Sequence, residues 1–460
     1  MEQILTKIVA AVNDVLWNKY LLLLFLLLGS GLYFSFRTKF VQVRKFGHGM
    51  KLVFGSISLR GKAAGKEGMS SFQALATAIA AQVGTGNIAG CASALVSGGP
   101  GAVFWMWVSA FFGMATIYGE AVLAQKYRQT GPDGSVSGGP IYYIKAAFRG
   151  RFGQFMAGFF AIAIILALGF MGNMVQSNSI GDAFFTAFGV PKLATGLVVA
   201  AISAFIFLGG VKRIAAITEK LVPIMACFYL LGALIAIGLH AQNILPAFRA
   251  IFLGAFQPQA IWGGVVGITV KEALRFGVAR GLFSNEAGMG STPHAHAMAK
   301  VQKPQDQGAV AMVGVFIDTF VVLTITALVI LTSGMLGTTD SQGNLLTATT
   351  LAQAAFNQAF GSFGNAFVAI CLLFFAFSTI IGWYFFGETN VKALFHGSKT
   401  ARVLYGLVAL GCIVLGSFQK VGLVWDLSDM FNGLMVIPNL LALLALSPIV
   451  VKFAKDDSYR

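Results

Sequence analysis

Two long stretches of this chain carry no charged side chain. No Asp, Glu, Lys or Arg occurs over residues 68–119, a run of 52 residues, or over residues 341–387, a run of 47. A helix needs about 20 apolar residues to cross the hydrocarbon core of a bilayer, so each run is long enough for two crossings. Only 11% of the 460 residues are charged, against about 25% in an ordinary soluble domain. These proportions exclude a soluble enzyme, a disordered protein and a secreted disulfide scaffold, and they predict a polytopic membrane protein.

The apolar runs predict an all-α protein with about eleven transmembrane helices. In lipid, only helices and closed barrels satisfy the backbone, and a barrel would show alternating segments of about 10 residues. The predicted helices cover approximately residues 15–36, 71–97, 101–126, 153–180, 191–211, 216–239, 262–299, 307–335, 362–388, 401–418 and 427–451. The seventh run is too long and too polar for one simple crossing, so we expect it to include an interfacial piece.

The basic residues are divided unequally between the two sides of this topology. With the N-terminus outside, 24 Lys and Arg residues fall on the inner side and five on the outer side, while three lie within the seventh run. Cytoplasmic loops of membrane proteins carry the excess of Lys and Arg. We therefore expect the N-terminus outside and the C-terminus in the cytoplasm. The net charge of +15 follows from this topology, and no single basic stripe of the kind that binds nucleic acid is formed.

Two of the predicted helices are interrupted by glycine and polar residues. The second reads Ala-Ala-Gln-Val-Gly-Thr-Gly-Asn over residues 80–87, and the seventh reads Gly-Leu-Phe-Ser-Asn-Glu-Ala-Gly-Met-Gly-Ser over residues 281–291. A single glycine in a membrane helix often marks close helix packing, but interrupted helices at corresponding positions are typical of transporters built from inverted repeats. We predict an extra N-terminal helix with a basic cytoplasmic segment (1–66), a first five-helix repeat (67–240) and a second five-helix repeat (241–460).

An unwound helix inside a bilayer frees backbone groups that can bind ligands. Freed amides attract a carboxylate, and freed carbonyls hold a cation. In the second run the freed amides are expected at Thr85 and Gly86. Neutral oxygen ligands suit a hard ion such as Na⁺, and the candidate oxygens belong to Ala80, Gln82, Val83 and Asn87. A plain kink lined by packing residues is the alternative.

Polar residues in other predicted helices are candidates for the same site. Ser378 and Thr379 lie in the ninth run, the eighth of the proposed ten-helix core, which can pack against the first interrupted helix. Ser and Thr in membrane helices most often bond to their own helix, so this pair alone means little. Trp383 is either a core aromatic or a wall of the pocket. Acidic residues inside a membrane are costly and therefore candidates for function, but a structural role is an equal alternative for Glu120, Glu286 and Asp318.

Four segments resemble one family of transporters. They are Gly-Gly-Pro-Gly-Ala-Val-Phe-Trp-Met-Trp-Val-Ser-Ala-Phe-Phe-Gly over residues 98–113, Arg-Gly-Leu-Phe-Ser-Asn-Glu-Ala-Gly-Met-Gly-Ser over 280–291, Gly-Asn-Met-Val-Gln over 172–176 and Phe-Ser-Thr-Ile-Ile-Gly-Trp over 377–383. In these segments the chain is similar to the alanine/glycine:cation symporter family, the bacterial sodium:alanine symporters. The resemblance implies an inner-membrane protein of the LeuT-like superfamily that spans the lipid bilayer with eleven helices. It also implies transport of small neutral amino acids with Na⁺, or sometimes H⁺.

The first break resembles a second family as well. Residues 82–87 are similar to the first unwound helix of the neurotransmitter:sodium symporters, Ala-Val-Gly-Leu-Gly-Asn, with Gln82 in place of the Ala. The resemblance implies that the Thr85 and Gly86 amides hold the substrate carboxylate, and that the Gln82 carbonyl and Asn87 form a substrate-adjacent sodium site. A second sodium site is implied at Ala80, Val83, Ser378 and Thr379. The full set of candidate substrate-binding residues is Thr85, Gly86, Gln82, Asn173, Gln176, Ser284, Gly288 and Trp383.

These observations favour a sodium-coupled secondary transporter for alanine and glycine. A proton-coupled permease, or one that prefers glutamine or serine, remains an alternative, as do a channel and a sensor. A channel would favour a repeated pore segment over two broken helices. The sequence contains no HExxH, GxSxG or GxxxxGK[ST] motif, which argues against an intramembrane enzyme and an ATP-driven pump. The oligomeric state is left open.

Overall fold

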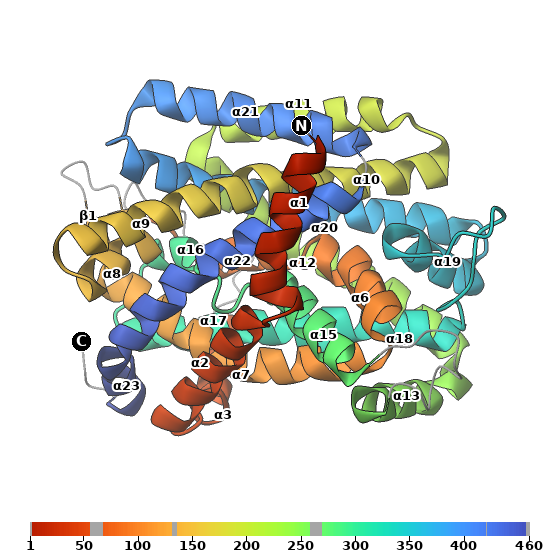
Figure 1. Cartoon of the computed structure of the whole chain (residues 1–460), viewed down its shortest axis with the longest axis horizontal. Helices are drawn as coiled ribbons and strands as arrows, with labels where there is room; N and C mark the ends of the chain where they lie inside the picture. The colour runs from red at the N-terminus through yellow and green to blue at the C-terminus, as the bar shows by residue number, and fades with distance from the viewer. Residues whose placement is uncertain (1, 56–67, 131–135, 258–268, 420, 457–460) are drawn as a thin grey trace.

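Apolar helices make up most of the computed structural model, which describes residues 2–55, 68–130, 136–257, 269–419 and 421–456 (Figure 1). Within these ranges, eight helices are long and apolar enough to cross a bilayer, and two helices that meet at a 47° bend form a ninth such unit. The eight cover Ile4–Arg37, Gly101–Lys126, Gly150–Phe188, Gly210–Leu239, Pro304–Ser333, Phe363–Leu394, Lys399–Phe418 and Gly422–Ala445. The prediction of a multi-pass membrane protein is confirmed. The count of eleven helices stays a prediction, and residues 56–67 and 262–268 of the predicted segments lie outside the described residues.

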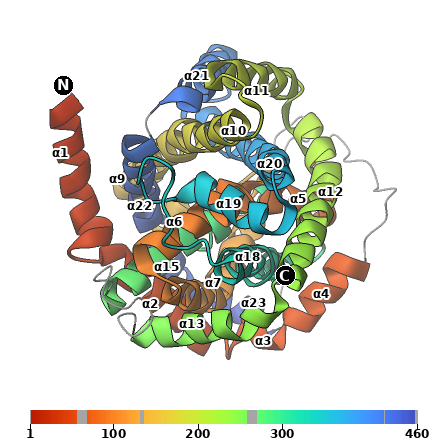
Figure 2. The same ribbon diagram turned by 90° about the vertical axis from the view of Figure 1, so that its right-hand side faces the viewer.

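The first predicted helix, 15–36, is divided in the structure. α1 (Glu2–Asn13) runs into the π-helical segment η1 (Asp14–Asn18), and α2 (Leu22–Arg37) begins after Leu21, whose backbone is left-handed with φ 54°. α1 lies on the outside of the bundle, at the left edge of Figure 2. Two short helices follow, α3 (Val41–Arg44) and α4 (Phe46–Gly55).

The next part of the chain contains the first break and a set of long helices. Its helices are α5 (Ser71–Gln82), η2 (Gly86–Gly90), α6 (Cys91–Gly98), α7 (Gly101–Lys126), α8 (Pro140–Ala147), α9 (Gly150–Ile164), η3 (Ile165–Gly172), α10 (Asn173–Phe188), α11 (Lys192–Phe207) and α12 (Gly210–Leu239). The segments η2 and η3 are π-helical. Two strands, β1 (Gln129–Thr130) and β2 (Val136–Ser137), pair antiparallel, with Gln129 opposite Ser137.

The remaining helices contain the second break. They are η4 (Ala241–Asn243), α13 (Ile244–Phe256), α15 (Val270–Asn285), α16 (Pro293–Ala297), α17 (Pro304–Val315), η5 (Phe316–Leu323), α18 (Thr324–Ser333), α19 (Ala348–Phe360), α20 (Phe363–Leu394), α21 (Lys399–Phe418), α22 (Val421–Ala445) and α23 (Ser447–Lys455). The sequence did not predict α13 and α19. Each has 13 residues, about 20 Å of helix, which is too short to cross a bilayer. The uncharged stretch 341–387, although long enough for two crossings, therefore holds α19 and part of one crossing, α20.

The helices differ in how deeply they lie in the bundle. In the most apolar window of α20, 72% of the residues are buried, whereas the corresponding value for α21 is 28%. α11 and α21 lie side by side along one side of the bundle in both views (Figures 1 and 2). Leu208 at the end of α11 is 88% exposed, as expected for a surface that faces lipid rather than water. α20 is thus a central helix, and its polar residues Ser378, Thr379 and Asn390 lie in the core.

Both broken helices begin at a capping box, and each ends at a residue whose backbone is no longer helical. α5 begins at a capping box, in which the Ser70 hydroxyl accepts from the Gln73 amide and the Gln73 side chain accepts from the Ser70 amide; Thr269 and Glu272 form the same arrangement before α15. Such boxes satisfy the first free amides of a helix. α5 ends where Val83 becomes extended, and α15 ends where Glu286 turns left-handed with φ 58°. Both expected breaks are present, and the division into repeats at 67 and 241 stays a prediction.

Candidate functional site

The two hydroxyls of the ninth predicted helix contact the first break. The Thr379 hydroxyl lies 2.9 Å from the Ala80 carbonyl oxygen and 3.5 Å from that of Val83. The Ser378 hydroxyl lies 3.2 Å from the Ala80 oxygen. Both hydroxyls also bond to the Phe375 carbonyl of their own helix, at 2.8 and 3.1 Å. The structure therefore brings together all four residues of the expected second sodium site, and each hydroxyl has a second partner within α20.

The backbone of the break lies against α10. The Thr85 amide donates to the Gln176 side-chain oxygen at 3.0 Å, and the Gly84 amide donates to the Asn87 side-chain oxygen at 2.9 Å. A Cβ atom at Gly84 would lie 2.3 Å from the Thr379 hydroxyl, so only glycine permits this approach of α20. Asn173 lies one turn before Gln176, and its side chain donates to the Gly169 carbonyl of the preceding segment η3 at 3.1 Å.

A buried carboxylate joins the two breaks. Asp318 in η5 accepts from the Asn87 amide group at 2.7 Å and from the Ser284 hydroxyl at 2.9 Å. The Thr319 hydroxyl donates to the same carboxylate at 2.9 Å. In addition, the Gln82 side chain donates to the Asn285 carbonyl at 2.7 Å. Two residues from the first break and two from the end of α15 thus meet around η5.

Aromatic rings and glycines narrow the space beside Gly86. A Cβ atom at Gly86 would lie 3.2 Å from both a ring carbon of Phe283 and the Ser284 Cα. The Phe283 ring packs edge-on against Trp383, with 5.6 Å between ring centroids. The Trp383 indole N–H donates to a Glu286 carboxylate oxygen at 2.5 Å. A Cβ atom at Gly172 would lie 2.4 Å from the Trp383 ring, so the indole fits only because this position is glycine.

The amides of the second break already have an anionic partner. The Gly288 and Gly290 amides donate to the two oxygens of the Glu120 carboxylate in α7, at 3.0 and 2.9 Å. The Asn439 side chain of α22 donates to the same carboxylate at 2.6 Å. Gly288, expected from the sequence to bind substrate, therefore has its amide occupied by Glu120. The two breaks are not equivalent, because among the described residues a carboxylate of the protein accepts from the amides of the second break, whereas the Gly84 and Thr85 amides of the first donate to neutral side chains.

Several polar atoms near the first break have no partner. The side-chain oxygens of Gln82, Thr85 and Asn173 are buried, and they make no hydrogen bond within the described part of the chain. Buried polar atoms are usually hydrogen-bonded, so a group of exceptions calls for an explanation. All three belong to the expected substrate-binding set, and a polar ligand would satisfy them.

A cavity approaches the same region between α4, α5, α12 and η5. Its volume is about 770 Å³, and its lining includes Ile79, Val83 and Met225. The Met225 sulfur lies 3.5 Å from the Ser378 hydroxyl. The cavity therefore reaches residues that touch the expected sodium ligands.

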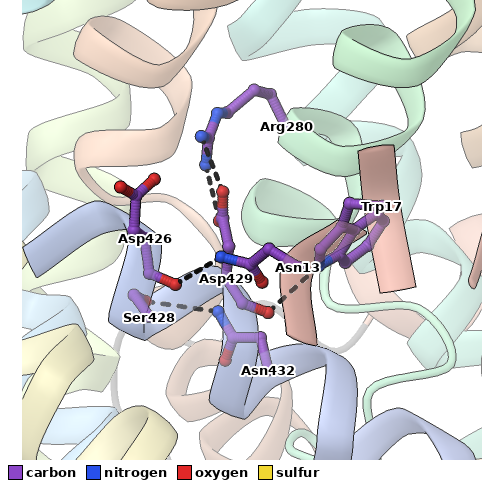
Figure 3. A network of polar contacts seen from close by, with 7 residues as sticks. All are labelled: Asn13, Trp17, Arg280, Asp426, Ser428, Asp429 and Asn432. Atoms are coloured by element: carbon purple, nitrogen blue, oxygen red, sulfur yellow. Dashed lines mark hydrogen bonds and ion pairs between the residues drawn. The ribbon is translucent and has the colours of Figure 1, made fainter. Parts of the chain in front are cut away.

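An ion pair links α15 to α22. Figure 3 shows Arg280 facing Asp429 of α22, and its two guanidinium nitrogens lie 2.8 and 2.9 Å from the two carboxylate oxygens. The side chains are 12% and 14% exposed. The N-terminal segment binds the same turn of α22, because Asn13 donates to the Asp426 carbonyl and Trp17 to the Asp429 carbonyl, at 2.9 and 3.0 Å (Figure 3).

Sequence reasoning identified some of these residues and missed others. Asp318, Glu120 and Glu286 were recognised only as costly acidic residues, and their partners could not be assigned. Phe283 and the pair of Arg280 with Asp429 were missed, although Arg280 is one of three basic residues inside the seventh run. A basic residue inside an apolar run usually pairs with an acidic residue, so Arg280 was the signal that could have suggested a buried carboxylate partner.

A model of the sodium:alanine symporter family matches residues 1–459 of the chain. The sodium/alanine symporter AgcS of Methanococcus maripaludis is 43% identical over 455 residues, which cover 98% of this chain and 96% of that protein. The "Probable sodium/glutamine symporter GlnT" of Bacillus subtilis is 42% identical over 456 residues, covering 99% and 91%.

A solved structure supports the same fold. The crystal structure of MhsT in complex with L-phenylalanine matches with a TM-score of 0.59 and 14% identity, over 86% of this chain and 100% of that chain. The likeness in structure confirms a LeuT-like helical fold. The relatives and the family are transporters, so the expectation that the chain is not an enzyme is confirmed as well.

Proposed function

Because the chain belongs to the sodium:alanine symporter family, we propose that it carries alanine and glycine into the cell by symport with Na⁺. The observation that carries the proposal is the meeting of four oxygens: the Ala80 carbonyl of α5, the Val83 carbonyl directly after it, and the Ser378 and Thr379 hydroxyls of α20. Such neutral oxygens can replace the hydration shell of a hard cation.

A cation among these oxygens couples ion binding to helix position. It holds α5 against α20, and its departure allows the two helices to separate. The cavity beside Val83 and Met225 gives the ion a route of release once they do. A ligand that binds one arrangement of the helices better than another shifts the protein toward that arrangement.

The substrate carboxylate binds at the Thr85 and Gly86 amides. The unpartnered Thr85 hydroxyl and Gln82 and Asn173 oxygens support a polar ligand in this region, and the Gln176 oxygen, which now accepts from Thr85, can take the substrate ammonium group instead. A neutral substrate is favoured because Asp318 and Glu286, which bond to the site residues Ser284 and Trp383, would repel a second carboxylate.

The size of the substrate is limited by the aromatic wall. Gly86 has no room for even a Cβ atom without movement of Phe283 or Ser284, and Trp383 is held by Glu286 and Gly172. Alanine and glycine fit this narrow site better than larger amino acids. Glutamine is the second candidate, because one relative carries that amino acid in its name.

The orientation in the membrane is proposed from the distribution of basic residues. We propose a protein of the bacterial inner membrane with the N-terminus outside, the C-terminus in the cytoplasm, and inverted repeats at 67–240 and 241–460. The 24 inner and five outer basic residues support this orientation. The Arg280–Asp429 pair then lies toward the outside and the Val83 cavity toward the inside.

Uptake into proteoliposomes tests the proposal directly. Radiolabelled alanine, glycine, serine and glutamine are offered to the purified full-length protein with an inward sodium gradient, with choline in place of sodium, and with an inward proton gradient alone. We expect accumulation of alanine and glycine only with sodium. Uptake that persists in choline and follows the proton gradient would overturn sodium coupling, and preferred uptake of glutamine would overturn the substrate assignment.

A further inference from the structure

A second cavity, remote in sequence from both breaks, lies where α20 ends and α21 begins. Its volume is about 310 Å³, and three basic side chains contribute to its lining, those of Lys392, His396 and Arg402. Within the part of the chain that the structure describes, no Asp or Glu is among the lining residues. The proposed transport of an amino acid and an ion uses none of these residues, so the cavity calls for an explanation of its own.

Two of these cations share a single carboxylate oxygen. The Arg402 guanidinium places Nε 2.9 Å and Nη2 2.8 Å from the Glu388 Oε1 atom, and the Lys392 ammonium lies 3.6 Å from the same atom. The Glu388 side chain is 3% exposed, whereas about a third of each cationic side chain is accessible. The buried carboxylate therefore fixes both cations beside the cavity, and the three groups together keep a surplus of one positive charge.

The cavity lies at the end of a membrane span. Lys392 belongs to the last turn of the span Phe363–Leu394. Ser137 and Tyr142 of the lining lie in the connection that follows α7, and His396 lies in the connection between α20 and α21. The proposed orientation places both connections on the cytoplasmic side. Basic pockets between membrane helices on that side are suited to the headgroups of anionic lipids.

An apolar surface adjoins the basic cavity. Directly after Arg402, the α21 side chains Val403, Leu404 and Leu407 are 61–62% exposed, as expected of a helix that faces lipid tails. A basic cavity beside such a surface fits an amphipathic ligand, with a phosphate at one end and acyl chains at the other. Inorganic phosphate would use the cavity alone, and the apolar surface therefore favours a phospholipid.

We propose that this cavity binds the phosphate of an anionic phospholipid, through Lys392, His396 and Arg402, and that the acyl chains lie along the exposed face of α21. The single negative charge of a phosphodiester balances the surplus positive charge of the site. The headgroup then joins the end of α20 to the start of α21. The inference is independent of the transported ion and substrate, and the proposed orientation decides only that the inner leaflet supplies the lipid.

Lipid binding to the purified, delipidated full-length protein in detergent tests the inference. Native mass spectrometry measures the affinity for dioleoylphosphatidylglycerol, and thermal unfolding measures its effect on Tm. Dioleoylphosphatidylcholine has the same acyl chains but no net charge, and inorganic phosphate has the charge but no acyl chains. We expect tight binding of phosphatidylglycerol with a rise in Tm, and neither effect from phosphatidylcholine or from inorganic phosphate at the same concentration.

Two variants locate the site. Lys392→Gln removes one cation of the cavity, while Arg402 keeps both of its contacts with Glu388. We expect about fivefold weaker binding of phosphatidylglycerol, because one basic residue near an anionic lipid contributes about 1 kcal/mol. Lys399→Gln is the matched control, since Lys399 begins α21, is exposed and does not line the cavity. It should bind phosphatidylglycerol like the wild type.

If Lys392→Gln does not fold, His396→Gly takes its place. The backbone of residue 396 is left-handed with φ 50°, a conformation that glycine adopts readily, and the substitution removes a lining side chain, so binding should again weaken. Equal binding of phosphatidylcholine, or an equal loss in Lys399→Gln, would overturn the inference, because the lipid would then not be recognised by this cavity. An equal rise in Tm with inorganic phosphate would show that the ligand is a free anion, which overturns the assignment to a lipid.

Discussion

The Thr379 hydroxyl of α20 lies 2.9 Å from the Ala80 carbonyl oxygen at the end of α5. This contact joins a helix that remains continuous for 32 residues to one that ends after 12. It is possible only because position 84 is glycine, since a Cβ atom there would lie 2.3 Å from the same hydroxyl. The contact lies at the expected ion ligands, and Gly84, which permits it, directly precedes Thr85 and Gly86, whose amides are expected to bind the substrate.

Removal of this hydroxyl should weaken the response to sodium. In Thr379→Ala one ion ligand is lost, and a lost contact worth about 1.4 kcal/mol raises the half-saturating sodium concentration roughly tenfold. Uptake should recover partly at high sodium, and Thr379→Ser should behave like the wild type. The measurement is the initial rate of alanine uptake against sodium concentration. An unchanged curve for Thr379→Ala would mean that the hydroxyl serves only its own helix, through the bond to Phe375.

Added bulk at Gly86 should abolish alanine binding. The Cβ atom of Gly86→Val would already press on Phe283 and Ser284, and its methyl groups would cover the amides expected to hold the substrate carboxylate. Overpacking of this kind costs about 1–3 kcal/mol of stability, which a well-packed bundle tolerates. Equilibrium binding of radiolabelled alanine measures the effect.

Gly90→Ala is the matched control for Gly86→Val. Gly90 ends the same π-helical segment, and a Cβ atom there would meet only the Thr85 carbonyl oxygen, at 3.8 Å. We expect near-normal alanine binding by this variant. Normal binding by a folded Gly86→Val protein would show that the carboxylate binds elsewhere.

Loss of the Arg280–Asp429 pair should destabilise the protein. Removing one partner of a buried ion pair lowers the free energy of unfolding by about 3–5 kcal/mol, because the other charge stays unpaired. Because this pair is slightly exposed, we expect Asp429→Asn to cost about 3 kcal/mol or less. Asp182→Asn breaks the more exposed pair with Lys192, for which about 0–1 kcal/mol is expected. Thermal unfolding in detergent compares the two, and equal shifts in Tm would contradict the structural role given to Arg280.

The orientation can be read from the labelling of single cysteines. With the exposed Cys227 replaced by Ser, Gln342→Cys should react with a membrane-impermeant maleimide in intact cells, whereas Thr400→Cys should react only after lysis. Both positions are exposed in the structure. The opposite pattern would reverse the proposed topology and the assignment of the outer and inner sides.

Much of the fold could be predicted because lipid imposes simple rules. Long uncharged runs gave the positions of the crossings, and α7 occupies the predicted 101–126. The interruptions of α5 and α15 were visible as glycine beside polar residues. The short helices α13 and α19 could not be predicted, because each has only 13 residues and includes polar ones, Arg249 in α13 and Thr, Gln and Asn in α19. Neither segment therefore stands out in the sequence as an apolar run long enough to cross a bilayer.

The candidate site was only partly predictable, because its contacts join residues far apart in the chain. Similarity to known transporters suggested Ser378 and Thr379, and the structure brings them to Ala80. No local pattern could reveal that Asp318 contacts Asn87, which lies 231 positions away, or that Gly288 contacts Glu120. Those pairings depend on how the helices pack, and the sequence alone gives each residue only as an isolated polar group in an apolar helix.

Glu120 gives the protein a resident anion at one of its two breaks. The Gly288 and Gly290 amides already donate to this carboxylate. A substrate carboxylate, including the second one of a dicarboxylic amino acid, can therefore bind only to the amides of the first break. We expect each transport cycle to carry a single amino acid molecule. The whole free energy of the ion gradient is then applied to that one molecule, which sets the highest concentration ratio that the cell can maintain.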